Sequence, residues 1–386
     1  MEKSILYGNF LYEIFKNMQK KILILSSSFY PNISPRSFRT TELAKEFARQ
    51  GHEVVVYTRK EHNNYNKIEK EFNITINDYG KFKLKIIKIK GTKIGLFARR
   101  AINRILLQLI DYPNIEFVLK VIKVLKNEFG YDLLISIAVP HQIHWGVALF
   151  GKNKLKKVAG TWVADCGDPY MGCMTNNFKK MPYFQLIEKL FCKNVDYISV
   201  PTKNAINGYY PQFKNKIKVI PQGFCFDNIK IYQGKVYNSR PTFGYSGSFI
   251  PNKRDPKNFI KYLNSTNRNY HFIIYSDQHE MLKNFGIINT NKIEIRSYIE
   301  RNELLYILSQ MDFLVNFEND TDIQTPSKLI DYALTKRPIL SVKNEANNFK
   351  VIDEFLDGNY QNSTNIINIE QYNIKNIVNT FIGLCK

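Results

Sequence analysis

The stretch from residue 21 to residue 58 decides the fold: "KILILSSSFYP" (21–31) is followed closely by "RTTELAKEFARQGHEVVVYT" (39–58). The first part is a continuous apolar run that opens into small polar residues, as expected of a parallel strand buried on both faces. In the second part, an apolar stripe at helical spacing ends at Gly51, and a new apolar run, "EVVVYT", follows. The pattern predicts a strand–helix–strand unit, and with it a parallel α/β sheet.

The alternation of strands and helices continues along the chain. Further apolar runs of strand length occur at 131–138, 156–164 and 195–202. Beyond a polar, unpatterned segment at 229–241, a second series of strands and helices begins with "PTFGYSGSF". We therefore predict an α/β protein with two Rossmann-like sheets joined by a linker.

The predicted domain boundaries follow from this pattern. Residues 1–19 are either an amphipathic N-terminal extension or the product of a misassigned start, because Met18 directly precedes the first strand. The other expected parts are an N-terminal Rossmann-like domain at 20–228, the linker at 229–241, a C-terminal Rossmann-like domain at 242–365, and a last helix in 366–386 that packs back toward the N-terminal domain.

The composition restricts the classes of function. Lys and Arg number 55 against 34 Asp and Glu, a net charge of +21, which suits a polyanion or an anionic surface as a partner. The five cysteines are odd in number and show no metal-ligand spacing, so we expect a reducing compartment and no metal site. No apolar run approaches the roughly 20 residues of a membrane span. The expected location is the cytoplasm.

Two segments concentrate the positive charge. "KFKLKIIKIKGTK" (81–93) alternates Lys with apolar residues, which predicts a strand, whereas "GLFARRAINRILLQL" (95–109) predicts an amphipathic helix that carries Arg99, Arg100 and Arg104. Such a helix suits the surface of an anionic membrane, or equally a core-facing position with solvated arginines. The first alternative implies peripheral attachment at the inner face of the cell membrane.

A possible anion site lies in "TPSKLIDYALTKRPILSV" (325–342), which predicts a helix followed by a strand. Thr325 suits the N-cap and Pro326 the first helical position. The N–H groups of Ser327 and Lys328 would be unpaired at this helix end, where the macrodipole and the lysine both favour an anion such as phosphate. The alternative is an ordinary capped helix with a solvated lysine.

Five motifs follow one another along the chain: "SSSFYPNISPRSFRTTELAKEFARQGHEV", "TWVADCGDPY", "YISVPT" with "IKVIPQGF", "FGYSGSFIPNKRDPKNF" and "TPSKLIDYALTKRPIL". On these motifs, the sequence resembles the GT-B glycosyltransferases, and more narrowly the retaining glycosyltransferase family 4, over roughly residues 20–370. The resemblance implies two facing Rossmann-like domains with a deep cleft between them, a nucleotide-sugar donor, no cofactor and no metal.

The resemblance places the donor in the C-terminal domain, where cations would neutralise the departing diphosphate. Asp331 would accept hydrogen bonds from the ribose hydroxyls. This sequence departs from the family in two places, because Ser248 stands where an arginine is usual and Ile323 where a carboxylate is usual. The predicted diphosphate ligands are Gly247, Ser248, Lys253, Arg254, Ser327 and Lys328.

The acceptor side is expected in the N-terminal domain. "NISPRSFR" stands in the place of a glycine-rich loop, and its Arg36 and Arg39 are predicted to bind the acceptor. Asp165 and Asp168 directly follow a strand and are candidates to orient or deprotonate the acceptor hydroxyl, with His144 as a further catalytic candidate. A turn-capping role for Asp168 and a structural role for His144 are the alternatives.

The resulting hypothesis is a retaining glycosyltransferase that moves a sugar from a nucleotide-sugar donor to a glycan, on a lipid carrier, in surface polysaccharide biosynthesis. Two other functions stay open. One is a GT-B sugar-nucleotide epimerase, which would turn over its donor without an acceptor. The other is a non-enzymatic polyanion-binding protein, although the sequence contains no recognisable nucleic-acid module.

Overall fold

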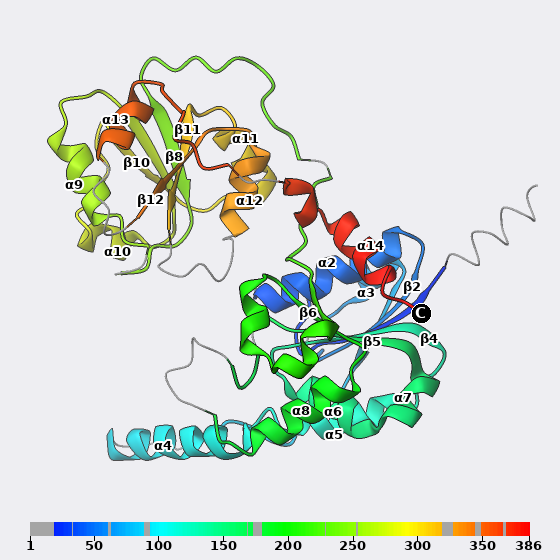
Figure 1. Cartoon of the computed structure of the whole chain (residues 1–386). Helices are drawn as coiled ribbons and strands as arrows, with labels where there is room; N and C mark the ends of the chain where they lie inside the picture. Colours follow the sequence, from blue (N-terminus) through cyan, green and yellow to red (C-terminus); the bar gives the residue numbers. More distant parts are fainter. Residues whose placement is uncertain are drawn as a thin grey trace, which may run out of the picture. The chain divides into compact units, whose positions relative to one another are not determined.

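The computed structural model describes residues 19–32, 34–60, 63–88, 93–167, 169–172, 180–227, 229–251, 254–318, 327–343, 349–365 and 368–386, with side chains except at 93, 94 and 327. It divides the chain into two compact units (Figure 1). Unit 1 runs up to Cys225 and resumes from Tyr372 to Lys386, and unit 2 spans Phe226–Gln371.

Unit 1 contains a seven-stranded sheet in the order β3-β2-β1-β4-β5-β6-β7, in which every neighbouring pair is parallel. Its strands are β1 (Lys21–Leu25), β2 (Glu53–Thr58), β3 (Ile74–Asp78), β4 (Tyr131–Ile137), β5 (Ala159–Asp165), β6 (Tyr197–Val200) and β7 (Ile217–Val219). The central strands are buried on both faces, which explains their continuous apolar runs. The predicted parallel α/β sheet is confirmed.

Helices cover both faces of this sheet. One face packs its apolar side chains against α2 (Pro35–Arg49), α3 (Asn66–Phe72) and the C-terminal α14 (Ile374–Ile382). The other face packs against α5 (Glu116–Leu125), α6 (Gln142–Phe150), α7 (Lys152–Val158) and α8 (Phe184–Asn194). Alternate residues of β1 serve the two faces, with Ile22 and Ile24 on the first and Leu23 and Leu25 on the second.

Helix α2 begins as its sequence dictates. The Ser34 hydroxyl accepts a hydrogen bond from the Ser37 N–H at 3.1 Å, and Pro35 occupies the first helical position. Because α2 follows directly on the loop after β1, this cap brings Arg36 and Arg39 to the carboxyl end of the sheet.

The strand predicted within 81–93 is wrong for the residues that the structure describes, since 81–88 lie outside both sheets. The backbone there bonds to helix side chains instead of to another strand. The Glu116 carboxylate accepts from the N–H groups of Lys83 and Leu84, and the Asn103 side-chain amide bonds both to the N–H and to the carbonyl of Ile87. The alternating pattern therefore did not mark a paired strand.

Helix α4 (Lys93–Ile110) extends the helix predicted at 95–109 by a few residues. Its apolar side chains are poorly covered, with Phe97 74% and Ile105 56% exposed. Figure 1 shows α4 in cyan, reaching out beyond the layer of α5, α6 and α8. Among the described residues, no helix combines the length and the apolar character that a membrane span requires.

Unit 2 contains a five-stranded parallel sheet in the order β10-β9-β8-β11-β12, covered on one face by α9, α10 and α13 and on the other by α11 and α12. Its strands are β8 (Thr242–Ser246), β9 (His271–Tyr275), β10 (Ile293–Arg296), β11 (Phe313–Phe317) and β12 (Ile339–Val342). Its helices are α9 (Lys257–Ser265), α10 (His279–Asn284), α11 (Arg301–Leu308), α12 (Ser327–Leu334) and α13 (Phe349–Leu356).

The chain returns to unit 1 after completing unit 2. The Phe224 N–H donates to the Tyr372 carbonyl at 2.8 Å, and α14 then packs on α2, with the rings of Phe47 and Phe381 6.4 Å apart. The predicted linker at 229–241 forms neither helix nor strand and lies within unit 2.

Candidate active site

The candidate donor site lies in unit 2, where α12 meets the end of β8. The Lys328 ammonium donates a hydrogen bond to the Tyr245 hydroxyl at 3.2 Å and lies 4.4 Å from the centre of the Tyr245 ring. The Tyr332 hydroxyl accepts from the Ser246 N–H at 2.8 Å. These contacts fix α12 against the end of β8.

Gly247 lets the backbone pass close to this lysine. Its φ of +140° lies in a region that residues with a side chain rarely adopt. A Cβ at this position would lie 3.4 Å from the Tyr245 hydroxyl and 3.9 Å from Lys328 Cδ. The predicted diphosphate ligands Gly247 and Lys328 are therefore neighbours.

The electrostatics of this corner favour an anion. Burial, and next the positive charge of Arg254, lower the pKa of Lys328 to about 7. The Arg254 Nε is buried and has no hydrogen-bond partner among the described residues. A bound phosphate would accept hydrogen bonds from such groups and would favour the charged form of the lysine.

Asp331 lies one turn along α12 from Lys328 and forms an ion pair with Arg301, the first residue of α11. Arg301 donates from Nε at 3.0 Å and from Nη2 at 2.6 Å, in both cases to Asp331 Oδ1. Burial raises the pKa of Asp331, and the charge and hydrogen bonds of Arg301 oppose that rise. The predicted ribose ligand thus has a cationic partner that the sequence analysis did not identify.

The remaining predicted donor ligands are placed only in part. Ser248 follows Gly247, its hydroxyl lies 3.4 Å from the Tyr298 hydroxyl, and its carbonyl accepts from the Tyr245 hydroxyl at 2.9 Å. Ser327 begins α12, but its side chain lies outside the described residues, as do Lys253, Thr325 and Pro326.

In unit 1, the predicted acceptor residue Arg39 and the predicted catalytic residue Asp165 are bonded to each other. Arg39 Nε and Nη2 lie 3.0 and 2.9 Å from the two Asp165 oxygens, and both side chains are almost fully buried. The Ser199 hydroxyl donates to Asp165 Oδ1 at 2.5 Å, while Arg39 also reaches the carbonyls of Ile220 and Pro221. This network joins α2 to the carboxyl ends of β5 and β6.

The pair fixes the charge of Asp165. Burial alone would raise the pKa of this carboxyl, but the charge of Arg39 and its hydrogen bonds, with help from Arg36 and Ser199, hold the pKa below its ordinary value. Asp165 is accordingly an ionised carboxylate whose oxygens are already engaged. Its action on an acceptor stays a prediction.

Arg36 lies over the residue that follows Cys166. A Cβ added to Gly167 would fall 1.5 Å from Arg36 Nη2, so the guanidinium occupies the space that any side chain at Gly167 would need. Arg36 also contributes to lowering the pKa values of His144 and Asp165. Asp168, the other predicted catalytic carboxylate, lies outside the described residues.

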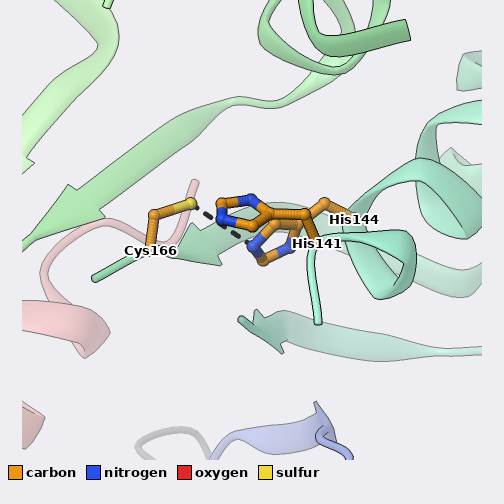
Figure 2. Close-up of side chains that lie close together, drawn as sticks. All are labelled: His141, His144 and Cys166. Atoms are coloured by element: carbon orange, nitrogen blue, oxygen red, sulfur yellow. Dashed lines mark hydrogen bonds between the residues drawn. The ribbon is translucent and has the colours of Figure 1, made fainter. Parts of the chain in front are cut away.

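His144 is fully buried, and Figure 2 shows it close to His141 and Cys166. Its Nδ1 lies 2.8 Å from the Ser136 hydroxyl and its Nε2 3.3 Å from Cys166 Sγ, and its ring stacks on Phe191. Burial, and next the neighbouring His141, hold the pKa of His144 well below its usual value. His144 is therefore a neutral imidazole with both nitrogens engaged, and its predicted catalytic role remains untested.

His141, His144 and Cys166 are the described residues best placed to hold a metal, since their ligand atoms lie within 4.8 Å of one another. Two imidazoles and a thiolate suit Zn²⁺. However, His144 already bonds to Cys166 on one side and to Ser136 on the other, and the Trp162 indole N–H donates to the same Ser136 hydroxyl at 2.8 Å. The network is complete as a set of hydrogen bonds.

Comparison with known proteins identifies the fold. Neither a family model nor a curated protein matches the sequence. Among solved structures, the sucrose-phosphate synthase of Thermosynechococcus elongatus is similar at 11% identity and a TM-score of 0.58, over 95% of this chain and 98% of that one. The lipopolysaccharide outer core galactosyltransferase WaaB in its apo form gives 13% identity and a TM-score of 0.57, over 94% and 99%.

A third similar structure is a TarM variant of S. aureus in complex with fondaparinux, alpha-GlcNAc-glycerol and UDP. It shares 12% identity with this chain at a TM-score of 0.53, over 95% of this chain and 99% of that one. These likenesses, together with the two parallel sheets, show that the chain has the two-domain GT-B fold of glycosyltransferases. The predicted fold class is confirmed.

Proposed function

We propose that this protein is a retaining, metal-independent glycosyltransferase of the family 4 type that takes its sugar from a nucleotide-sugar donor. The observation that carries the proposal is the corner of unit 2 where Lys328, Arg254 and Gly247 meet the start of α12. Unneutralised cations and helix N–H groups at the carboxyl end of a parallel sheet are what a diphosphate requires. Asp331, on the same helix, is suited to the ribose.

The proposed chemistry needs the diphosphate as leaving group. The acceptor oxygen attacks the anomeric carbon on the face from which the diphosphate departs, and a diphosphate oxygen takes the acceptor proton, so the configuration is retained. Lys328 and Arg254 would stabilise the charge that develops on the departing oxygen, with the predicted ligands Lys253 and Ser327 assisting. No metal is needed for this role if the cations supply the charge.

For the acceptor, we propose the edge of unit 1 at Arg36, His144 and Asp165, with the predicted catalytic residue Asp168 as a further participant. Arg36 is partly exposed, whereas His144 and Asp165 are buried. Its guanidinium is therefore suited to bind an acceptor phosphate. Because Asp165 forms a buried ion pair with Arg39, its proposed role is to stabilise this edge. WaaB acts on the lipopolysaccharide outer core by its name, and a lipid-linked surface glycan is our proposed acceptor.

The exposed helix α4 supports attachment to an anionic membrane surface from the cytoplasmic side. Its apolar residues Phe97 and Ile105 are exposed beside Arg99, Arg100 and Arg104, and the helix contains no Asp or Glu. Pairing of α4 with a second copy would bring these like charges together, whereas anionic lipid headgroups would neutralise them. The surface is therefore better matched to lipid than to another copy of the chain.

A nucleotide-binding experiment tests the donor site directly. Ribonucleoside diphosphates at one hundred times their dissociation constant should stabilise the protein by about 2.7 kcal/mol. Lys328→Ala should abolish this shift. Lys292→Ala is the matched control, because Lys292 likewise lies over a tyrosine ring, 5.2 Å from the centre of Tyr270, but in another part of unit 2.

The outcomes separate the candidate functions. No response to any nucleotide would contradict the enzyme proposal and favour the polyanion-binding alternative. Donor turnover that proceeds without any acceptor, with inversion at a carbon of the sugar, would identify an epimerase instead. Transfer with retention to a lipid-linked acceptor would establish the proposed reaction.

A further inference from the structure

The ion pair between Arg301 and Asp331 has a geometry that matters for the donor. The two hydrogen bonds from Arg301, at 3.0 and 2.6 Å, end on the same oxygen, Asp331 Oδ1. The two side chains are only 34% and 26% exposed, which is more sheltered than an ordinary surface pair. Two guanidinium donors on one oxygen hold Asp331 Oδ1 against Arg301 and leave Oδ2 outside the ion pair.

This arrangement leaves Asp331 Oδ2 as the acceptor for a ligand. Arg301 begins α11, and the Glu300 side chain caps that helix by accepting from the N–H groups of Asn302 and Glu303. The guanidinium is thus presented from an anchored helix start.

We propose that Arg301 is a positioning and specificity residue of the donor site, which orients Asp331 to accept hydrogen bonds from both ribose hydroxyls of a ribonucleotide. This inference rests on the proposed function and adds the class of nucleotide. A 2′-deoxy analogue would leave an oriented carboxylate with one donor fewer, and such a loss at a partly buried charged group weakens binding by about tenfold or more.

The test compares the diphosphates of uridine, guanosine, adenosine and cytidine with their 2′-deoxy counterparts in calorimetric titrations of the full chain. The wild type should bind its preferred ribonucleotide at least about tenfold more tightly than the deoxy analogue. Arg301→Gln should bring this ratio below about threefold while diphosphate binding persists. Arg268→Gln is the matched control, since Arg268 pairs with Asp353 and Asp357 at a different place in unit 2.

A double substitution separates positioning from mere structural support. If Arg301 acts through Asp331, then Arg301→Gln should have no further effect on the ribose-to-deoxyribose ratio in an Asp331→Asn background. Arg301→Lys, which keeps the charge but not the planar fork, should lower the ratio partway. If Arg301→Gln does not fold, the Lys variant carries the same comparison.

Two results would overturn the inference while leaving the proposed function intact: equal binding of ribo- and deoxynucleotides by the wild type, or an unchanged ratio in Arg301→Gln and Arg301→Lys. Failure of the wild type to bind any nucleotide would instead overturn the proposed function itself.

Discussion

The Lys328 ammonium donates to the Tyr245 hydroxyl at 3.2 Å and lies 4.4 Å from the centre of the same ring. The aromatic face and hydroxyl hold the lysine in place, yet they do not neutralise its charge. Burial, and next the positive charge of Arg254, lower the pKa of Lys328 to about 7. Protonation of this side chain is consequently sensitive to pH near neutrality, and a bound anion should shift it.

The first prediction concerns the pH dependence of donor binding. A diphosphate favours the charged lysine, so binding raises the pKa of Lys328 above about 7 and takes up a proton at higher pH. Affinity should be full well below pH 7 and should fall by up to about tenfold per pH unit above it. Calorimetry with a nucleotide sugar in buffers of different ionisation enthalpy measures the proton uptake directly. Lys328→Met should remove the pH dependence, and a flat wild-type profile would contradict the assignment.

The second prediction concerns the buried Arg39–Asp165 pair. Asp165→Asn leaves the Arg39 guanidinium buried without its counter-charge, and we expect a loss of about 3–5 kcal/mol in the stability of unit 1. Glu53→Gln, which breaks an exposed pair with Lys21 of 3.5 Å, should cost less than about 1 kcal/mol. Urea denaturation followed by probes in each unit would measure both. Equal effects of the two substitutions would show that the buried pair does not support the fold.

The third prediction concerns Gly167. A Cβ there would displace the Arg36 guanidinium, which is the mobile end of a long side chain, so Gly167→Ala should leave the melting temperature almost unchanged. If Arg36 meets the acceptor, the KM for the acceptor should rise while nucleotide binding stays constant. By contrast, Gly146→Ala would place a Cβ 2.7 Å from Val121 Cβ and 2.9 Å from a backbone oxygen, and this variant should lose stability. An unchanged acceptor KM in Gly167→Ala would remove Arg36 from the acceptor site.

The fourth prediction concerns α4 at membranes. The wild type should float with vesicles that contain anionic phospholipid and should remain in solution with purely zwitterionic ones. Charge reversal by Arg99→Glu, Arg100→Glu and Arg104→Glu together, or Phe97→Ser with Ile105→Ser, should each abolish flotation. The matched control reverses three exposed lysines of α7, Lys152, Lys154 and Lys157. Equal loss in the α7 variant would mean that the net charge, and not the α4 surface, attracts the protein.

The fifth prediction concerns metal. The hydrogen bonds of His144 to Ser136 and Cys166 complete the buried network, so chelation with EDTA should change neither the thermal stability nor the nucleotide affinity. A loss of stability on chelation that Zn²⁺ restores, and that Cys166→Ser abolishes, would show that His141, His144 and Cys166 bind a metal in solution.

Much of the fold could be predicted because its evidence is local. A parallel strand that is buried on both faces has a continuous apolar sequence, and the start of a helix such as α2 is indicated by its capping residue. The prediction of a strand within 81–93 was wrong because local sequence evidence does not report pairing between distant segments. Alternation records an extended backbone, whereas pairing depends on what lies alongside, here the side chains of Glu116 and Asn103.

The candidate site was predictable only as separate segments. Lys328 and Gly247 could be expected near each other, because both follow strands of one parallel sheet. The partners of the two carboxylates could not, since Arg301 is 30 residues from Asp331 and Arg39 is 126 residues from Asp165 along the chain. A cation at a helix start beside a strand end was the available signal for Arg301, but sequence alone does not say which carboxylate it meets.

The return of the chain to unit 1 through α14 also sets the order in which the protein can fold during synthesis. The core beneath α2 includes Ile374, Ile377 and Phe381, which leave the ribosome after all of unit 2. Unit 2 is continuous in sequence and can fold as soon as it emerges. Unit 1, although translated first, lacks part of the core beside α2 until the last helix arrives.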